Sequence, residues 1–110
     1  MSPSKFKVII SAEAYDDLER MFKALAKTRE DAVYVKKHIE GIIAAALSLS
    51  TFPGRGNWDE GAPANFLYIL HKKHKLFYAI NDEQHTVVLL RVVHSSLSYK
   101  DCLLHKKQPS

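Results

Sequence analysis

Residues 65–94 contain the feature that most constrains the fold, an alternation of apolar and polar side chains with two short breaks. Such alternation is typical of strands with one buried face, and the breaks at Lys72-Lys73 and at 81–85 have the length of turns. Turns this short join antiparallel neighbours and leave no room for a crossover helix. The pattern therefore predicts an antiparallel meander of three strands, at 66–71, 74–80 and 86–94.

The last of these strands is apolar on both faces and is expected at a central position in the sheet. Arg91 and His94 interrupt its apolar run. A buried arginine needs a carboxylate or carbonyl partner, and Asp101 or an acidic residue of another protein is the expected one. Because strand side chains alternate with a period of two, Arg91 and His94 should lie on opposite faces unless a bulge intervenes.

The first half of the chain predicts a short edge strand at 5–11 followed by two helices. Ser11 is the expected N-cap of a helix that runs to Lys27. Thr28 and Asp31 resemble a capping box that opens a second helix, which must end by Pro53. The short link makes the two helices an antiparallel hairpin. Apolar residues at helical spacing are expected in the core, namely Tyr15, Leu18, Met21, Phe22 and Leu25 in the first helix and Ala32, Val35, Ile39, Ile42, Ile43, Ala46 and Leu47 in the second.

Residues 54–64 hold three of the four glycines and predict an irregular loop that needs an anchor. Trp58 either packs on the sheet or the helices in that role, or it docks a partner. The serines at 95, 96 and 98 are expected to cap a short helix that includes Tyr99, Leu103 and Leu104, and the tail at 105–110 is expected to fray.

The composition, with 46% hydrophobic and 25% charged residues, is that of one globular domain over residues 1–110. The single cysteine, Cys102, excludes an internal disulfide, and without a metal-binding motif or a glycine-rich phosphate loop we expect neither a metal nor a cofactor. The absence of a membrane-length apolar run and of a signal sequence predicts a cytoplasmic protein that binds no membrane.

The net charge of +4 belongs to the second half of the chain. Residues 65–110 carry seven basic and three acidic side chains, whereas residues 1–64 carry nine of each. Such asymmetry indicates either that the sheet meets an anionic partner or that it has a solvated face, and the sequence leaves both open.

The order of these elements and three short motifs resemble the RelE/ParE superfamily of toxins from type II toxin–antitoxin systems, and its ParE-like branch in particular. The motifs are Phe52-Pro53-Gly54-Arg55-Gly56 after the second helix, Leu76-Phe77-Tyr78 in the middle strand, and Arg91-Val92-Val93-His94 at the end of the last strand. The resemblance covers residues 5–101. It implies an α+β fold in which the N-terminal strand joins the meander in one sheet and the helix hairpin packs on one face.

The resemblance also implies a toxin that binds and poisons DNA gyrase and is neutralised by a cognate antitoxin. The residues expected to contact the antitoxin are Tyr15 and Phe22. Those expected to contact the target are Arg91, His94, Lys72, Lys73, Lys75 and Trp58.

Two other functions remain open. Ribosome-dependent cleavage of mRNA needs an acid, a base and cations around the phosphate, and the candidates for these roles are His94, Arg91, Tyr99 and Lys73. The third possibility is a binding module without toxicity.

Overall fold

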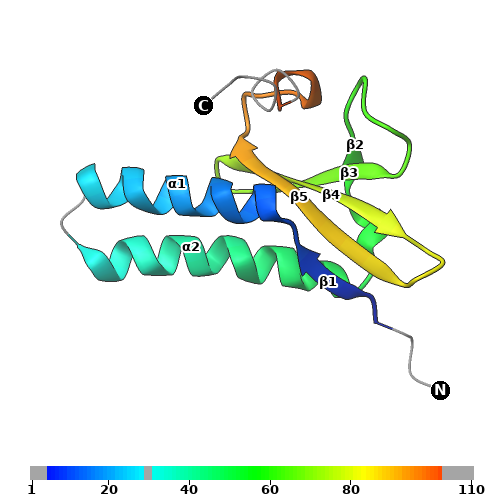
Figure 1. The fold of residues 1–110 in the computed structure, drawn as a ribbon, viewed down its shortest axis with the longest axis horizontal. Coiled ribbons are helices and arrows are strands. Elements are labelled where there is room, and N and C mark those ends of the chain that lie inside the picture. Colours follow the sequence, from blue (N-terminus) through cyan, green and yellow to red (C-terminus); the bar gives the residue numbers. More distant parts are fainter. Residues whose placement is uncertain (1–4, 29–30, 103–110) are drawn as a thin grey trace.

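The computed structural model describes residues 5–28 and 31–102 as one sheet covered by two helices (Figure 1). The elements are β1 (Lys7–Ile10), α1 (Ala12–Thr28), α2 (Ala32–Leu47), β2 (Asn57–Trp58), β3 (Phe66–His71), β4 (His74–Asn81) and β5 (Thr86–His94), with short 3₁₀ helices at Ser48–Ser50 and Pro53–Arg55. This is the predicted α+β arrangement. The tail at 105–110, expected to fray, lies outside the described residues.

The five strands lie in the order β1-β5-β4-β3-β2. Strands β3, β4 and β5 form the predicted antiparallel meander, and β1 pairs in parallel with β5 so that Lys7 lies opposite Thr86. Strand β5 is therefore enclosed by β1 and β4, which confirms its expected position inside the sheet. Strand β2, in the segment expected to be an irregular loop, adds two residues to the outer edge of β3, with Trp58 opposite Leu67.

Both faces of the sheet are covered. On one face the helices and strands share a core cluster of Ala14, Leu18, Ile42, Ala46, Leu76, Leu89 and Val92. On the other face the chain returns after β5 (orange in Figure 1) and buries Phe77, Val93 and Cys102, with Leu97 and Tyr99 packed against them. Each large apolar side chain so buried contributes roughly 1.5–3 kcal/mol, so these two layers fix the orientation of β5.

The helix caps confirm one prediction and correct another. The Ser11 hydroxyl accepts a hydrogen bond from the Ala14 amide at 3.1 Å, as expected for the N-cap of α1. The N-cap of α2 is Asp31, whose carboxylate accepts the amides of the second and third helical residues at 3.0 and 3.3 Å. The predicted capping box is wrong, because Thr28 is the last residue of α1 and its hydroxyl donates back to carbonyls of that helix.

The prediction that the aromatic residues of α1 lie in the core is also wrong. Tyr15 is 60% exposed and Phe22 is 46% exposed, whereas Ala14, Asp17 and Leu18 are buried. The buried residues 14, 17 and 18 lie on one side of the helix, and positions 15 and 22 fall just outside that side. On α2 the expected Val35, Ile42 and Ala46 are buried, but the outer members of the predicted stripe, Ala32 and Leu47, are exposed.

No helix within residues 5–28 and 31–102 is long and apolar enough to cross a membrane.

Candidate functional site

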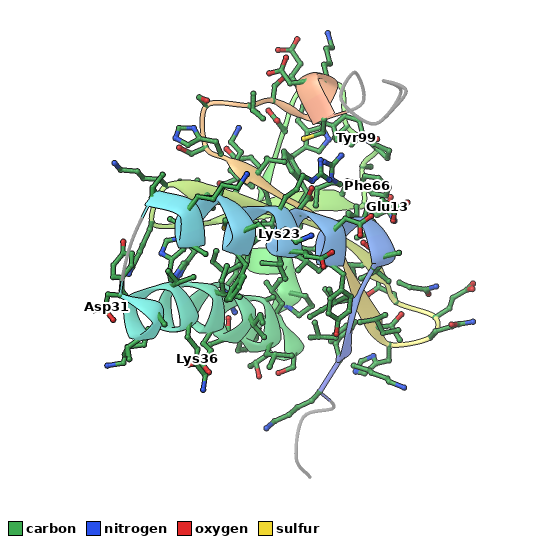
Figure 2. The ribbon with its side chains drawn as sticks, turned by 60° about the vertical axis from the view of Figure 1, so that its left-hand side comes forward. Glu13, Lys23, Asp31, Lys36, Phe66 and Tyr99 are labelled. Carbon is green, nitrogen blue, oxygen red and sulfur yellow. The ribbon has the colours of Figure 1, made fainter. Side chains whose placement is uncertain are left out.

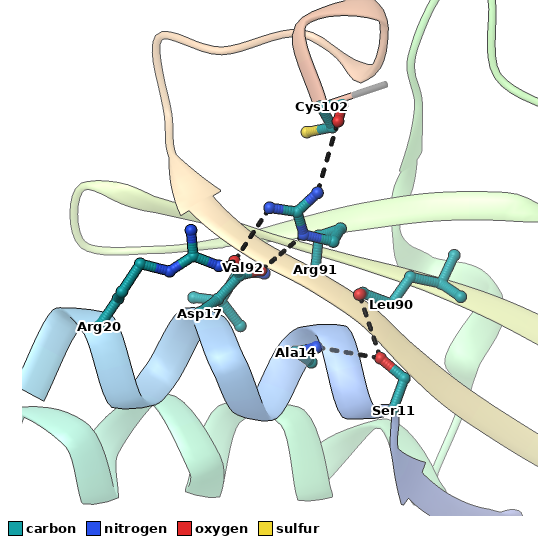
Figure 3. Close-up of polar contacts among 8 residues, drawn as sticks. All are labelled: Ser11, Ala14, Asp17, Arg20, Leu90, Arg91, Val92 and Cys102. Carbon is teal, nitrogen blue, oxygen red and sulfur yellow. Dashed lines mark hydrogen bonds and ion pairs between the residues drawn. The ribbon is translucent and has the colours of Figure 1, made fainter. Parts of the chain in front are cut away.

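The edge of β5 beyond the end of β1 is completed by polar side chains of the segment that leads into α1 and of α1 itself (Figure 3). Strand β1 pairs with β5 only as far as Leu89. Beyond that point the Ser11 hydroxyl donates to the carbonyl of Leu90 at 3.1 Å, and the Asp17 carboxylate accepts the Val92 amide at 2.9 Å. Buried backbone groups must be paired, so these two side chains take over the role of a neighbouring strand.

The same carboxylate binds Arg91 through both of its oxygens (Figure 3). Nε of Arg91 lies 2.7 Å from Asp17 Oδ2, and Nη2 lies 2.9 Å from Oδ1. The Arg91 side chain is 17% exposed and that of Asp17 6% exposed, so the ion pair is well shielded from water. Hydrogen bonding to Asp17 raises the pKa of the Arg91 guanidinium, which outweighs the opposing effect of burial.

Arg91 also donates from Nη1 to the carbonyl of Cys102, at 3.4 Å. The expectation that Asp101 would neutralise Arg91 is wrong, because Asp101 instead accepts hydrogen bonds from the amide and hydroxyl of Ser98. The Ser98 hydroxyl in turn accepts the Asp101 amide, and residues 99–102 are helical, as the serines predicted. The predicted helical residues Leu103 and Leu104 lie outside the described part of the chain.

A β-bulge in β5 sets the direction of Arg91. Tyr78 pairs with Leu89 and the preceding Phe77 pairs with Arg91, which leaves Leu90 without a partner on β4. An extra residue reverses the alternation of side chains. Arg91 consequently leaves the face that Leu89 shares with the helices and faces the second layer.

Arg91 and His94 lie on opposite faces of β5, as predicted. Val92, two residues before His94, packs in the helix-side core. The His94 ring contacts His74, which contacts His38 of α2. The pairing of β4 with β5 continues without a further shift from Arg91 to His94, so the two side chains do not meet.

A pocket of about 170 Å³ opens on the Arg91 side of the sheet. Its walls are mostly apolar and are formed by Glu13, Phe66, Phe77, Leu90, Arg91, Tyr99 and Cys102. Figure 2 shows Glu13, Phe66 and Tyr99 together beside the N-terminal end of α1. The Tyr99 amide donates to Asp59 at 2.8 Å, and its ring meets the rings of Phe66 and Phe77 edge to face. Arg91 and Tyr99, two of the residues proposed for RNA cleavage, thus share one pocket.

Cys102 also lines this pocket; its thiol is buried, and burial raises its pKa. A thiol with a raised pKa is a poor nucleophile at neutral pH.

Lys75 and Trp58, both expected to contact the target, differ in their availability. Lys75 donates to the Leu97 carbonyl at 3.0 Å, lies 3.8 Å from an Asp59 oxygen, and sits over the Tyr68 ring. Its charge is therefore used within the fold. Trp58 is 54% exposed, and its indole N–H donates to the Ala62 carbonyl at 2.9 Å, so the ring is held in place without being buried.

Four histidines, one each from α2, β3, β4 and β5, meet near the C-terminal end of β5. The ring centroids of His38 and His74 are 5.6 Å apart, and those of His74 and His94 are 6.4 Å apart. His71 is paired with His74 across the β3–β4 turn. No group of three or more histidine, cysteine or acidic side chains among the described residues is arranged to hold a metal ion.

Like charges surround this histidine cluster. Burial lowers the pKa of His74, and the neighbouring His38, His94 and His71 lower it further. Burial also lowers the pKa of His38, followed by the effects of Lys72 and His71. Nδ1 of His74 is buried and has no hydrogen-bond partner among the described residues. These two rings are therefore held in the neutral form at pH 7.

The exposed tip of the β3–β4 hairpin carries Lys72 and Lys73. Lys72 has a positive φ of 55°, which allows the two-residue turn that the sequence predicted. His94 beside the tip is held by Ser96, whose amide donates to Nδ1 at 3.1 Å. The nuclease candidates His94 and Lys73 therefore belong to this end, away from the pocket that holds Arg91 and Tyr99.

The mixed sheet with a helix hairpin on one face defines a RelE/ParE-like protein. The sequence model for the ParE toxin of type II toxin–antitoxin systems, parDE, matches residues 8–99. The chain therefore belongs to the ParE toxin family.

Solved structures share this fold. A chain of the toxin–antitoxin complex RelBE2 from Mycobacterium tuberculosis is 24% identical, with a TM-score of 0.61 over 82% of this chain and 98% of that chain. A chain of the chromosomal ParDE system from P. aeruginosa is 11% identical, with a TM-score of 0.68 over 82% of this chain and 96% of that chain. A search of curated proteins finds no match.

Proposed function

We propose that this ParE-family chain poisons DNA gyrase by binding it and does not cleave RNA. The observation that carries the proposal is the bidentate ion pair of Arg91 with Asp17, at 2.7 and 2.9 Å. A nuclease would need that guanidinium for the phosphate, with an acid or base beside it. Here the guanidinium is occupied, and His94 lies on the other face of the sheet. The family match to the ParE toxin supports the same proposal.

We further propose that a cognate antitoxin covers the exposed apolar residues of α1. The two structural relatives come from systems described as RelBE2 and ParDE toxin–antitoxin systems. Tyr15 and Phe22 are 60% and 46% exposed and lie seven residues apart, on one face of the helix. An antitoxin segment that folds on binding would bury both rings with an amphipathic helix.

The target contacts proposed from the sequence divide into accessible and occupied side chains. Lys72, Lys73 and His94 are exposed at one end of the sheet, and Trp58 is half exposed at the β2 edge. Arg91 and Lys75 are occupied by contacts within the fold. We therefore propose that the accessible residues contact gyrase. Arg91 and Lys75 would instead stabilise the fold that presents these residues.

The test uses the purified chain without its antitoxin in two parallel assays. A gyrase supercoiling assay should show inhibition, and a translation extract should yield mRNA without new cleavage sites. Normal supercoiling at a large excess of the chain would sink the gyrase proposal. The Asp16→Asn variant, altered at an exposed position on α1, should behave like the parent chain in both assays and so controls for protein quality.

The second candidate is ribosome-dependent mRNA cleavage, which one observation favours. Arg91 and Tyr99 line the same pocket, and a guanidinium has five N–H groups, more than the three hydrogen bonds that Arg91 donates to other described residues. Cleaved mRNA together with normal supercoiling would establish this candidate. In that case Tyr99→Phe should reduce cleavage while the thermal stability stays unchanged.

A further inference from the structure

Phe52 has a backbone conformation that is disfavoured both for a phenylalanine and for a residue that precedes a proline. Its φ and ψ are 52° and 59°, in the left-handed region that non-glycine residues seldom adopt. The next residue is Pro53, which pushes the residue before it toward extended conformations. A phenylalanine held in this way is strained, and such strain persists only where the surrounding structure enforces it.

The fold gains little from the Phe52 ring in return. The side chain is 80% exposed, more than any other large apolar residue exposed in the described part of the chain. Neither the conformation nor the position of this phenylalanine is therefore explained by the packing of the domain.

The loop that carries Phe52 is held rigidly by hydrogen bonds. Nη1 of Arg55 donates to the carbonyls of Ser48 and Thr51 at 3.3 and 2.9 Å, and Nη2 donates to the Ser48 hydroxyl at 2.6 Å. The Arg55 amide donates to the Phe52 carbonyl at 3.2 Å. One arginine side chain thus ties both sides of the bend together.

The far side of the loop is fixed to the core of the domain. The hydroxyl of Tyr78, which is fully buried, donates to the carbonyl of Pro53. Gly56 lies so close that a Cβ at its position would collide with the same hydroxyl. Burial raises the pKa of Tyr78, so the hydroxyl remains a donor at neutral pH. The strained residue consequently sits on a preorganised support.

The charge beside Phe52 indicates the chemistry of its partner. Arg55 is exposed, and no ion pair between described residues involves it. A surface that receives the Phe52 ring must also face this guanidinium, which favours acidic side chains at its border. Rigid aromatic anchors that enter apolar pockets carry most of the binding energy in many interfaces.

We propose that Phe52 is an anchor residue for the protein that this toxin poisons, and that its ring enters an apolar pocket bordered by carboxylates. The inference rests on the proposed function, because it requires a folded protein target. An antitoxin segment that folds on binding brings its own apolar side chains and needs a groove on the toxin. A folded target has pockets, which need a rigid side chain from the toxin.

The test compares three variants expressed without antitoxin in growing bacteria. Phe52→Asn removes the ring and places a residue that tolerates a positive φ. Phe52→Tyr keeps an aromatic ring, and Val33→Ala alters a residue that is 60% exposed at the start of α2. The readouts are the expression level that arrests growth and the melting temperature of each purified protein.

We expect Phe52→Asn to require at least about tenfold more protein for arrest, with an unchanged or higher melting temperature. Val33→Ala should stay within about twofold of the parent chain on the same scale. Phe52→Tyr keeps the ring and should lose less activity than Phe52→Asn. An asparagine variant that arrests growth as well as the parent overturns the proposal. Loss of arrest together with a lower melting temperature also overturns it, because the ring would then serve the fold.

The outcome for gyrase is separate. A parent chain that arrests growth but leaves supercoiling normal refutes gyrase as the target, and the comparison of the Phe52 variants still holds. A parent chain that does not arrest growth overturns both proposals.

Discussion

Two regions at the end of β5 treat ionisable side chains in opposite ways. On one side Arg91 is matched by Asp17, and the carboxylate also satisfies the amide of Val92. On the other side His74 lies between His38 and His94, and its Nδ1 has no hydrogen-bond partner among the described residues. Only three positions in one strand separate the two arrangements.

The difference shows which charged groups are committed to the fold. A buried charge whose partners are all present stabilises one conformation, and removal of one partner leaves the other uncompensated. A half-buried cluster of histidines destabilises the fold when the rings become protonated, because the positive charges repel one another and are poorly hydrated. We therefore expect the ion-pair side to be sensitive to mutation, and the stability contributed by the histidine side to depend on pH.

The largest effect should come from Asp17→Ala. The change leaves the Arg91 guanidinium and the Val92 amide without their acceptor, which should lower the free energy of unfolding by about 3 kcal/mol or more. Urea denaturation followed by circular dichroism measures it. Asp16→Ala, at the exposed neighbouring position, should change the value by less than about 0.5 kcal/mol. A small effect at Asp17 would remove the distinction between the two regions.

Arg91→Lys should have an intermediate effect. Lysine keeps the charge but cannot donate two parallel hydrogen bonds to one carboxylate, so we expect a loss of about 1–2 kcal/mol in the same denaturation experiment. Arg20→Lys is the matched control, because Arg20 lies 3.5 Å from the same carboxylate but its side chain is 73% exposed. Equal effects at the two arginines would show that burial does not matter here.

The histidine cluster should make stability depend on pH. The pKa values of His38 and His74 are lowered below 6.5 in the folded chain, so the unfolded chain binds protons first as the pH falls. Stability should therefore be complete above about pH 7 and should decline as the pH falls through 6.5 toward the lowered pKa values. Urea midpoints at pH 7.5 and pH 5.5 measure the decline.

The variant His74→Gln should reduce that decline. His85→Asn is the matched control, since His85 lies outside the cluster, stacked on Phe6, and has a positive φ of 56° that asparagine tolerates. Equal declines in His74→Gln and the parent chain would contradict the assignment of the effect to the cluster.

The smallest effect on stability should come from Lys73→Gln at the exposed hairpin tip. The free energy of unfolding should change by less than about 0.5 kcal/mol, whereas inhibition of supercoiling should weaken because a target contact is lost. Unchanged inhibition would show that the tip does not contact gyrase.

The sequence predicted the meander and the helix hairpin because both depend on short-range periodicity. It also placed Arg91 and His94 on opposite faces, since strand alternation is local. The errors have a common cause in the packing of distant segments. Asp17 lies 74 positions before Arg91. Acidic residues are common in the first turns of a helix because of the helix dipole, so its position in the sequence did not indicate a contact with Arg91.

The histidine cluster was not predicted for the same reason. His38 belongs to α2, and its partners His74 and His94 belong to β4 and β5, so no spacing along the chain joins them. The position of the bulge at Leu90 was likewise not predicted, because the alternation of side chains does not show where an extra residue lies. Asp101 was the expected partner of Arg91 because it is near in sequence, and the fold brought Asp17 instead.

The most direct test of this account replaces the ion pair by a neutral pair, in the double variant Asp17→Asn/Arg91→Gln. An asparagine oxygen can still accept the Val92 amide, and the glutamine amide can donate to its neighbour. The measurement is growth arrest on expression without antitoxin, with folding checked by circular dichroism. If Arg91 serves the fold, the folded double variant should arrest growth at the same expression level as the parent chain. A folded double variant that no longer arrests growth would show that the guanidinium itself acts on the target.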